Sequence, residues 1–287
     1  MTKAQVTNAK LTKACVIGWP IEHSRSPLIH GYWLKKHGIA GSYTKEAVKP
    51  ENLEAFLNSL AANGYSGCNV TVPHKEAAYL IATDKTASAM AVGAANTVWL
   101  EHGGLACANT DTYGFMTHLG VSAPDWMQRD APVVILGAGG AARAIIYGFL
   151  AAGVTDVRVF NRSHARAEAL AHHFGPSVKA CTWGSLETSS GDASVVVNTT
   201  ALGMKGQPDL DFDVSRLAKT CVVADIVYVP LETPLLEAAR ARGLRTVDGL
   251  GMLLHQAVPG FEKWFGVTPE VTPELRALVE ADINGTA

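Results

Sequence analysis

The sequence predicts an α/β fold with two lobes, and three observations support this fold class. Short apolar runs alternate with amphipathic segments along most of the 287 residues, which is typical of strands joined by crossover helices. A chain of this length exceeds the usual size of one hydrophobic core. Near its middle, a glycine-rich turn follows an apolar run and opens a second series of strands and helices. We therefore expect an N-terminal α/β lobe followed by a doubly wound lobe.

The first half of the chain divides into strands, helices and a hairpin. The expected strands are residues 14–19, 42–48 and 67–72, the expected helices are residues 27–37, 51–62 and 75–82, and a hairpin covers residues 96–101 and 105–108. Ser26 is placed to cap the first helix, with Pro27 in its first turn. Pro73 ends the third strand because it lacks a backbone N–H donor.

The second half repeats the alternation and then becomes helical. The expected strands are residues 133–136, 157–160, 194–198, 222–226 and 245–247, with helices between most of them. After Gly249 the pattern is helical, and we expect a terminal helical pair that packs back on the first lobe. The predicted domains are residues 11–111 with 249–287, and residues 112–248. A cleft between them is the expected place for a ligand.

Composition excludes several classes of protein. The chain is 48% hydrophobic and 17% charged with a formal net charge of -2, so it has no basic excess for nucleic acid. No apolar run approaches the roughly 20 residues of a membrane span, and residues 1–12 lack the apolar core of a signal peptide. The five cysteines are widely spaced, which suits neither a metal site nor a disulfide scaffold. We expect a cytoplasmic protein with reduced thiols and no bound metal.

The segment from Val134 to Ile145 predicts a dinucleotide site. It reads as a strand, a tight glycine turn and a helix N-terminus, where free N–H groups and the helix dipole attract phosphate. Gly137 allows the turn, Gly139 lets a pyrophosphate approach the backbone, and Ala142 lets helix and strand pack closely.

The next predicted strand indicates which dinucleotide is bound. It ends at Asn161-Arg162-Ser163, about 20 residues after the glycines, and Arg166 lies one helical turn further on. An NAD site usually has Asp or Glu here, whereas a guanidinium binds the 2′-phosphate of NADP. The segment therefore favours NADP over NAD. The alternative is a surface arginine beside a helix that begins near Ser163.

Polar clusters at the ends of first-lobe elements suggest a small, polar ligand. His23-Ser24-Arg25-Ser26-Pro27 places two hydroxyls at a helix start, which suits a carboxylate, although Ser26 could serve only as a helix cap. Further clusters are 69–75, 93–97 and 109–112, and one Lys, one Asp, two Asn and one Thr among their residues could bind a small ligand. Each cluster alone could be a turn or a solvated side chain. Together with a dinucleotide site, they favour a polyhydroxylated substrate.

These segments, taken in order, resemble the shikimate dehydrogenase family, which includes the shikimate/quinate dehydrogenases. The matching segments are Ser24–Pro27, Asn69–Lys75, Ala94–Thr97, Asn109–Asp111, Gly137–Ala141, Asn161–Ser163 and Gly249–Leu253 with Gln256. The resemblance implies a Rossmann-type nucleotide domain and NADP-dependent reduction of 3-dehydroshikimate to shikimate, in aromatic amino-acid biosynthesis. Thr112 departs from the glycine expected there, and His74 from the expected aromatic residue.

The resemblance also implies roles for residues of the substrate site. Lys75 and Asp111 would form the catalytic pair. Six residues would bind the substrate, its carboxylate by Ser24, Ser26 and Tyr228 and its ring hydroxyls by Thr71, Asn96 and Gln256. Lys75 would exchange a proton with the substrate oxygen. An alternative acid is a histidine, and His74, His23 and His255 all lie beside motif residues.

On the cofactor side, the resemblance implies three groups of residues. The pyrophosphate would lie on Gly137, Ala138, Gly139, Gly140 and Ala141, the 2′-phosphate among Asn161, Arg162, Ser163 and Arg166, and the nicotinamide beside Ile226 and Gly249. Alternatives to the main interpretation are a quinate or aminoshikimate dehydrogenase and a non-catalytic NADP-binding regulator. We expect no nucleic-acid or membrane partner, and a monomer or homodimer.

Overall fold

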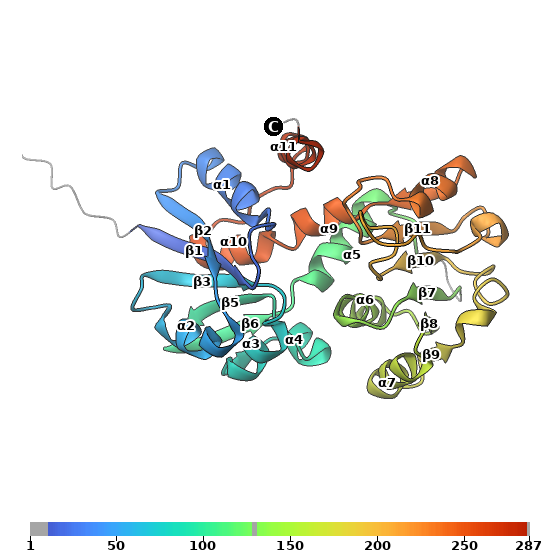
Figure 1. Ribbon diagram of the computed structural model, residues 1–287, viewed down its shortest axis with the longest axis horizontal. Coiled ribbons are helices and arrows are strands. Elements are labelled where there is room, and N and C mark those ends of the chain that lie inside the picture. Colours follow the sequence, from blue (N-terminus) through green and yellow to red (C-terminus); the bar gives the residue numbers. More distant parts are fainter. Residues whose placement is uncertain (1–10, 128–130, 286–287) are drawn as a thin grey trace, which may run out of the picture.

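The structure is a computed structural model that describes residues 11–127 and 131–285. It has two lobes side by side, each built on one six-stranded sheet (Figure 1). Among the described residues, no helix is both long and apolar enough to cross a membrane. All five cysteines are free thiols, as predicted.

The first lobe contains a mixed sheet. Its strands are β1 (Thr12–Gly18), β2 (Gly41–Ala47), β3 (Tyr65–Val70), β4 (Asp84–Lys85), β5 (Thr97–Glu101) and β6 (Gly104–Ala108). Their order is β2-β1-β3-β5-β6-β4, with β5 antiparallel to both β3 and β6 and the other pairs parallel. The predicted hairpin is confirmed. Strand β4 was not predicted, since two residues carry no readable alternation.

The described N-terminal segment of this lobe contains four α-helices: α1 (Ser26–Lys36), α2 (Leu53–Ser59), α3 (Lys75–Ile81) and α4 (Ala87–Val92). The predicted capping of α1 by Ser26 is wrong. Arg25 occupies the cap position with φ −93° and ψ −2°, so the chain already turns as a helix there and Ser26 is the first helical residue. Helix α2 is shorter than predicted, because a 3-10 turn, Pro50–Asn52, precedes it.

The second lobe contains a fully parallel sheet. Its strands are β7 (Val133–Leu136), β8 (Val157–Phe160), β9 (Val178–Cys181), β10 (Val195–Asn198), β11 (Val222–Asp225) and β12 (Arg245–Val247), in the order β12-β11-β10-β7-β8-β9. Helices α6 (Gly140–Ala151), α7 (His164–Phe174) and α8 (Pro234–Ala241) connect them. This is the strand order of a Rossmann fold, as predicted. The short edge strand β9 was not predicted.

Helices α5 (Asp111–Ser122) and α9 (Gly249–His255) pack against each other and carry the chain between the lobes. The predicted domain boundaries, near residues 111 and 249, fall where these helices begin; the division into two domains stays a prediction.

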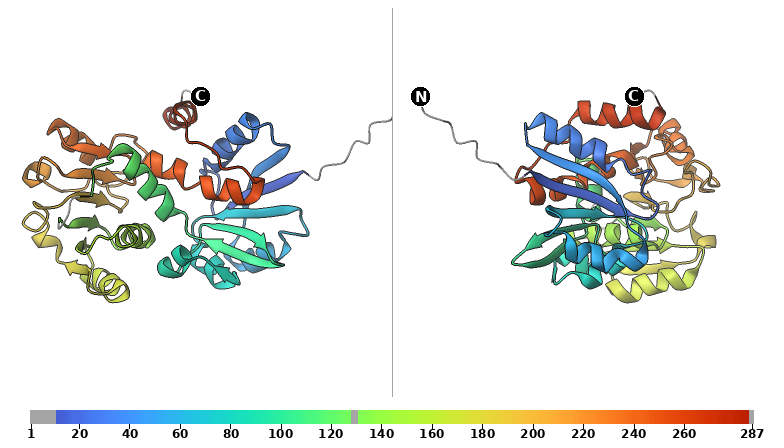
Figure 2. Two further views of the ribbon diagram at one scale, coloured as in Figure 1. Left: turned by 180° about the vertical axis from the view of Figure 1, so that it is seen from behind. Right: turned by 60° about the vertical axis from the view of Figure 1, so that its left-hand side comes forward.

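The chain ends on the first lobe, as expected, with α10 (Val258–Phe265) against β1, β3 and β5 and α11 (Pro273–Asn284) against α1 (Figure 2). The expected terminal pair is therefore a set of three helices, α9 to α11. Phe261, Trp264 and Leu275 share a buried core with Val16 of β1.

Candidate active site

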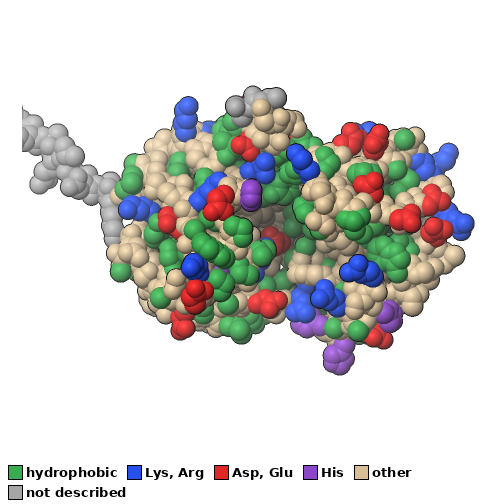
Figure 3. Space-filling model, viewed as in Figure 1, with side chains coloured by type: hydrophobic (Ala, Val, Ile, Leu, Met, Phe, Trp, Pro, Cys, Tyr) green, Lys and Arg blue, Asp and Glu red, His purple; other side chains and the backbone are tan. Residues whose placement is uncertain are grey.

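A cavity of about 350 Å³ lies between the lobes, where the surface is hollowed (Figure 3). Its walls come from the ends of β1 and β3, from the first residues of α1, α3, α5 and α9, and from the segment after β11. All eight residues predicted for catalysis and substrate binding line it: Ser24, Ser26, Thr71, Lys75, Asn96, Asp111, Tyr228 and Gln256. Ile226 and Gly249 line it as well. The fold thus gathers residues that are up to 232 positions apart in the chain (Ser24 and Gln256).

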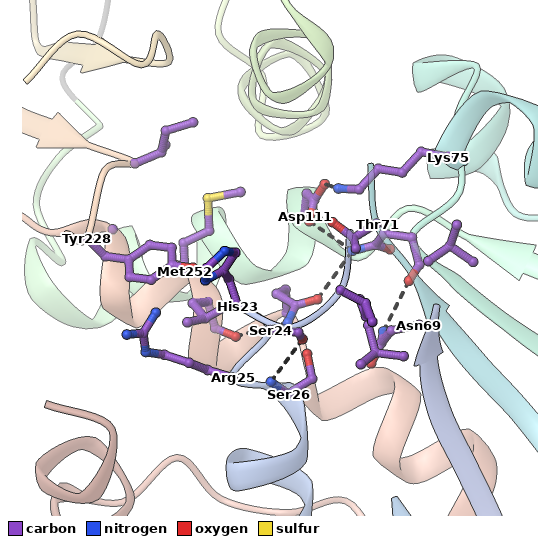
Figure 4. A pocket seen from close by; sticks show the side chains of 18 of the residues that line it. His23, Ser24, Arg25, Ser26, Asn69, Thr71, Lys75, Asp111, Tyr228 and Met252 are labelled. Carbon is purple, nitrogen blue, oxygen red and sulfur yellow. Dashed lines mark hydrogen bonds and ion pairs between the residues drawn. The ribbon is translucent and has the colours of Figure 1, made fainter. Parts of the chain in front are cut away.

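An ion pair joins Lys75 to Asp111, with 2.7 Å between Nζ and Oδ2. Each residue is the first of its helix, α3 or α5, so both side chains start at the rim of the sheet (Figure 4). Their side chains are 32% and 14% exposed, so the pair is shielded but reachable from the cavity. The arrangement can hold an amine where a proton is exchanged with a ligand oxygen.

Asn96 and Gln256 extend this pair into a polar network. Asn96 Nδ2 donates to Asp111 Oδ1 over 2.8 Å and to Gln256 Oε1 over 3.3 Å. The amide of Asn96 is oriented by the Thr110 backbone, whose N–H donates to Asn96 Oδ1 over 2.7 Å. Gln256 Nε2 in turn donates to the Leu253 carbonyl over 3.0 Å. The amide orientations are therefore fixed before any ligand arrives.

The serine end of the cavity lies across from Lys75 (Figure 4). The Ser26 backbone N–H donates to Ser24 Oγ over 3.4 Å, which keeps the two serines together. Arg25 also lines the cavity, and no role was predicted for it. The sequence feature that could have pointed to Arg25 was its position between Ser24 and Ser26.

The three histidines considered as alternative acids differ in their surroundings. His74 is 2% exposed, its Nε2 lies 2.7 Å from the Val48 carbonyl oxygen, and it does not line the cavity. His255 does not line it either, and burial together with the charge of His118 lowers its pKa to about 4. Only His23 of the three lines the cavity. The geometry therefore favours Lys75 over His74 and His255.

The glycine turn after β7 has the shape of a phosphate site. Gly137 has φ +110°, and a Cβ there would lie 2.6 Å from Thr199 Oγ1. Gly139 occupies the cap position of the 12-residue helix α6, so no side chain caps the first N–H groups of this helix. A Cβ on Gly139 or Gly140 would meet nothing within 4 Å, so the space in front of the helix N-terminus is open. These residues fit a dinucleotide pyrophosphate.

Asn161, Arg162 and Ser163 follow β8 directly, and Asn161 Nδ2 donates to the Ser163 carbonyl over 2.8 Å. Arg162 and Arg166 are exposed, and neither forms an ion pair with a described residue. Ser163 occupies the cap position of α7 without a side-chain capping bond. Two free guanidinium groups at this place fit a 2′-phosphate.

Three family profiles match the chain: the shikimate dehydrogenase substrate binding domain over residues 16–98, shikimate / quinate 5-dehydrogenase over 123–204 and the shikimate 5'-dehydrogenase C-terminal domain over 249–278. Shikimate dehydrogenase (NADP(+)) of Azorhizobium caulinodans is 58% identical over 273 residues, covering 95% of this chain and 97% of the relative. That of Brucella abortus is 54% identical over 278 residues, or 96% of each chain.

Solved structures of similar proteins share the whole architecture. Quinate dehydrogenase from Corynebacterium glutamicum in complex with NAD superposes with a TM-score of 0.85 at 32% identity, covering 94% of this chain and 98% of the other. Shikimate 5-dehydrogenase from Thermus thermophilus in complex with NADP(H) and shikimate gives a TM-score of 0.82 at 32% identity, covering 96% and 100%.

Proposed function

The chain belongs to the shikimate dehydrogenase family, and from this we infer that it interconverts shikimate and 3-dehydroshikimate with NADP as the cofactor, in aromatic amino-acid biosynthesis. One observation carries the inference to this chain. The Lys75–Asp111 ion pair of 2.7 Å lies in the same cavity as a serine pair suited to a carboxylate and amides suited to hydroxyls.

The comparisons favour shikimate over quinate as the substrate. Relatives at 54–58% identity are named shikimate dehydrogenase (NADP(+)), whereas the quinate dehydrogenase is 32% identical. Lys75 and Asp111 are both present and paired, which speaks against a non-catalytic NADP-binding regulator.

We propose that the substrate binds across the cavity, with its carboxylate at the serines and its ring toward Lys75. Ser24, Ser26 and Tyr228 donate hydrogen bonds to the carboxylate. The ring hydroxyls are bound by Thr71, Asn96 and Gln256, and the network around Asn96 holds the two amides in place. This binding orients the reacting carbon toward the second lobe.

Lys75 is the proton carrier of the proposed mechanism. In the oxidation of shikimate, neutral Lys75 takes the proton of the reacting hydroxyl as the carbonyl forms, and in the reverse direction the ammonium returns it to the oxygen. Asp111 accepts hydrogen bonds from both Lys75 and Asn96, so it keeps the amine pointed at the reacting oxygen.

When bound, NADP⁺ would supply the hydride-accepting chemistry at the ring carbon that carries the reacting hydroxyl. Gly137, Ala138, Gly139, Gly140 and Ala141 would hold its pyrophosphate, and Asn161, Arg162, Ser163 and Arg166 its 2′-phosphate. Ile226 and Gly249 would line the nicotinamide side. A Cβ at Gly249 would lie 2.2 Å from the Ile226 carbonyl oxygen, so this contact between loop and helix requires glycine.

At the scale of the whole chain, we propose a substrate domain of residues 11–111 with 249–287 and an NADP domain of residues 112–248. We further propose a cytoplasmic enzyme that acts as a monomer or homodimer without a nucleic-acid or membrane partner.

The test is the formation of NADPH from NADP⁺ with shikimate, followed through its absorbance, with quinate and NAD⁺ in parallel assays. We expect the highest kcat/KM with shikimate and NADP⁺. A higher kcat/KM with quinate would contradict the assignment of the substrate, and a higher kcat/KM with NAD⁺ would contradict the assignment of the cofactor.

A further inference from the structure

Arg25 occupies a place in the cavity that the mechanism above does not use. It lies between Ser24 and Ser26, and its side chain extends beneath the ring of Tyr228 (Figure 4). Apart from the Lys75–Asp111 pair, it is the only Lys, Arg, Asp or Glu among the described residues that line the cavity. The acid partner of Lys75, Asp111, lines the cavity, whereas the acid partner of Arg25, Asp282, does not. Among the described residues of this lining, Arg25 is therefore the one cation whose counter-charge lies outside it.

The guanidinium of Arg25 is held along one edge only. Its Nε donates to Asp282 Oδ2 of helix α11 over 2.8 Å, and its central carbon lies 6.0 Å from the centroid of the Tyr228 ring. Neither Nη group donates to any of the described residues. The side chain is 21% exposed. An ion pair thus orients the group while its two Nη donors stay free for a ligand.

A carboxylate bound only by hydroxyl donors would lose its hydration without gaining a counter-charge. A guanidinium offers parallel N–H donors that match a carboxylate, with a strength that neutral donors lack. We propose that Arg25 supplies the positive charge that recognises the substrate carboxylate, so that it selects ring acids over uncharged ring compounds, while Asp282 of α11 positions its guanidinium. The proposal rests on the proposed function, which it deepens.

The experiment compares Arg25→Met with the wild-type enzyme on shikimate and on its uncharged methyl ester. Arg25→Met keeps the aliphatic stem and removes the charge. We expect the KM for shikimate to rise about 10- to 100-fold, because a charge-assisted contact is lost. The kcat for shikimate, the KM for NADP⁺ and the KM for the ester should change less than about twofold, since the contact lies away from the reacting carbon.

Three further variants separate the charge from a structural role. Arg25→Lys keeps the charge and should have a KM for shikimate between those of the wild type and Arg25→Met. Asp282→Ala breaks the ion pair but leaves the guanidinium, so the KM for shikimate should rise less than about fivefold. Lys45→Met is the control: it removes a nearby positive charge that does not line the cavity. Lys45 Nζ donates to the Glu22 carbonyl, next to the serine segment. This variant should change the KM for shikimate less than about twofold.

Equal losses for shikimate and its ester in Arg25→Met, or the same loss in Asp282→Ala, would show that Arg25 only fixes the loop to α11 and would overturn the proposal. Titration calorimetry of both compounds keeps the test separate from catalysis. If the wild-type enzyme binds shikimate in an Arg25-dependent way without oxidising it, the inference holds and the proposed function fails. Wild-type protein that binds neither compound would overturn both.

Discussion

Lys75 and Asp111 are each the first residue of a helix, and their side chains form an ion pair. Each follows a polar cluster at the end of a strand or hairpin, and the sheet of the first lobe brings the two clusters to one rim. The second oxygen of Asp111 accepts from Asn96, so removal of one member disturbs the other contacts. Catalytic roles at this site should therefore be measured as a coupled unit.

Replacing Lys75 with Met is expected to lower kcat for shikimate by about 10²–10⁴-fold, the usual contribution of general acid–base catalysis. Met has a similar length but cannot carry the proton. The affinity for shikimate, measured by calorimetry, should fall less, because the carboxylate and hydroxyl contacts remain. Near-normal kcat in a folded Lys75→Met enzyme would move the role to His23, the one histidine of the three alternatives that lines the cavity.

Asp111→Asn provides the matching test of the pair. It keeps a hydrogen-bonding shape but loses the charge that holds the ammonium, so kcat should fall as well. In the double variant the loss should be smaller than the product of the two single losses, since both residues act on one proton. Independent, multiplicative losses would contradict the coupled role.

Arg162 is expected to distinguish NADP from NAD. Arg162→Ala should raise the KM for NADP⁺ about tenfold or more, because a charge-assisted hydrogen bond to the 2′-phosphate is lost. NAD⁺ lacks that phosphate, so its KM should stay nearly unchanged. Arg158 differs from Arg162 in that its guanidinium is already paired with Asp156 and Asp192, so it serves as the position for a control substitution. Equal effects of Arg162→Ala on both cofactors would refute the assignment.

At the scale of elements, α5 and α9 cross closely because glycines stand at their contact. A Cβ on Gly114 of α5 would lie 2.7 Å from the Met252 carbonyl oxygen and from Gln256 Cβ. A Cβ on Gly251 of α9 would lie 2.1 Å from the ring of His118. Small residues on both helices therefore permit the close approach that places Gln256 in the cavity.

Gly114→Ala should lower the free energy of unfolding by about 1–3 kcal/mol, because backbone atoms of α9 cannot move aside easily. Gly120→Ala is the matched control on the same helix, since a Cβ there meets nothing within 4 Å. That variant should be neutral or more stable by about 1 kcal/mol, through helix propensity. Urea unfolding of both variants decides this, and equal stability would refute the close-packing argument.

Thr112, which departs from the family pattern, also contributes at this scale. Its Oγ1 donates to the Ala144 carbonyl of α6 over 2.9 Å, so it links α5 to the helix that follows the glycine turn. His74, the other departure, is bound to the Val48 carbonyl and packs inside the first lobe. Neither departure alters the Lys75–Asp111 pair.

At the scale of the whole molecule, the lobes are joined at more than the α5–α9 crossing. Arg143 of α6 donates from Nη1 to the Val92 carbonyl over 3.2 Å, and His173 Nε2 of α7 lies 2.7 Å from the Ala91 carbonyl oxygen. Both carbonyls belong to α4 of the first lobe. The two lobes are thus in contact on a second side of the cleft.

The stability of the interlobe region should depend on pH through Asp248, which caps α9 and binds Arg276 of α11 over 2.9 Å. Burial alone would raise the pKa of Asp248, but the hydrogen bonds of Arg276 and the nearby Arg276 and His118 side chains outweigh it and hold the pKa well below 3.8. A carboxyl whose pKa is depressed by folding stabilises the protein above its unfolded pKa, and this stabilisation is lost as the pH falls.

Asp248→Asn should therefore lower the free energy of unfolding by about 1–3 kcal/mol at pH 7. The difference from the wild type should narrow as the pH falls below the ordinary Asp value of 3.8, because Asp248 of the unfolded chain then gains a proton while the folded carboxylate keeps its charge to lower pH. Urea unfolding at a series of pH values measures this. A difference that stayed constant down to low pH would exclude the carboxylate charge as its cause.

The local features of this protein can be predicted from its amino-acid sequence. The glycine turn, the position of the arginines after β8 and the central strands of the second lobe were all predictable, because each is set by residues within one strand–turn–helix unit. Strands β4 and β9, helix α4 and the cap of α1 were missed or misplaced, since short elements depend on neighbours that pair with them rather than on their own pattern.

Which polar residues face one another depends on the path of the whole chain. Asn96 meets Gln256 across 160 positions of the chain, and Arg25 meets Asp282 across 257. Such contacts depend on how α9 to α11 return to the first lobe, and that path is fixed by burial of Phe261, Trp264 and Leu275 against its sheet and helix α1. Hydrophobic burial is non-directional, so local sequence signals the buried face of a helix but not the partner it will cover.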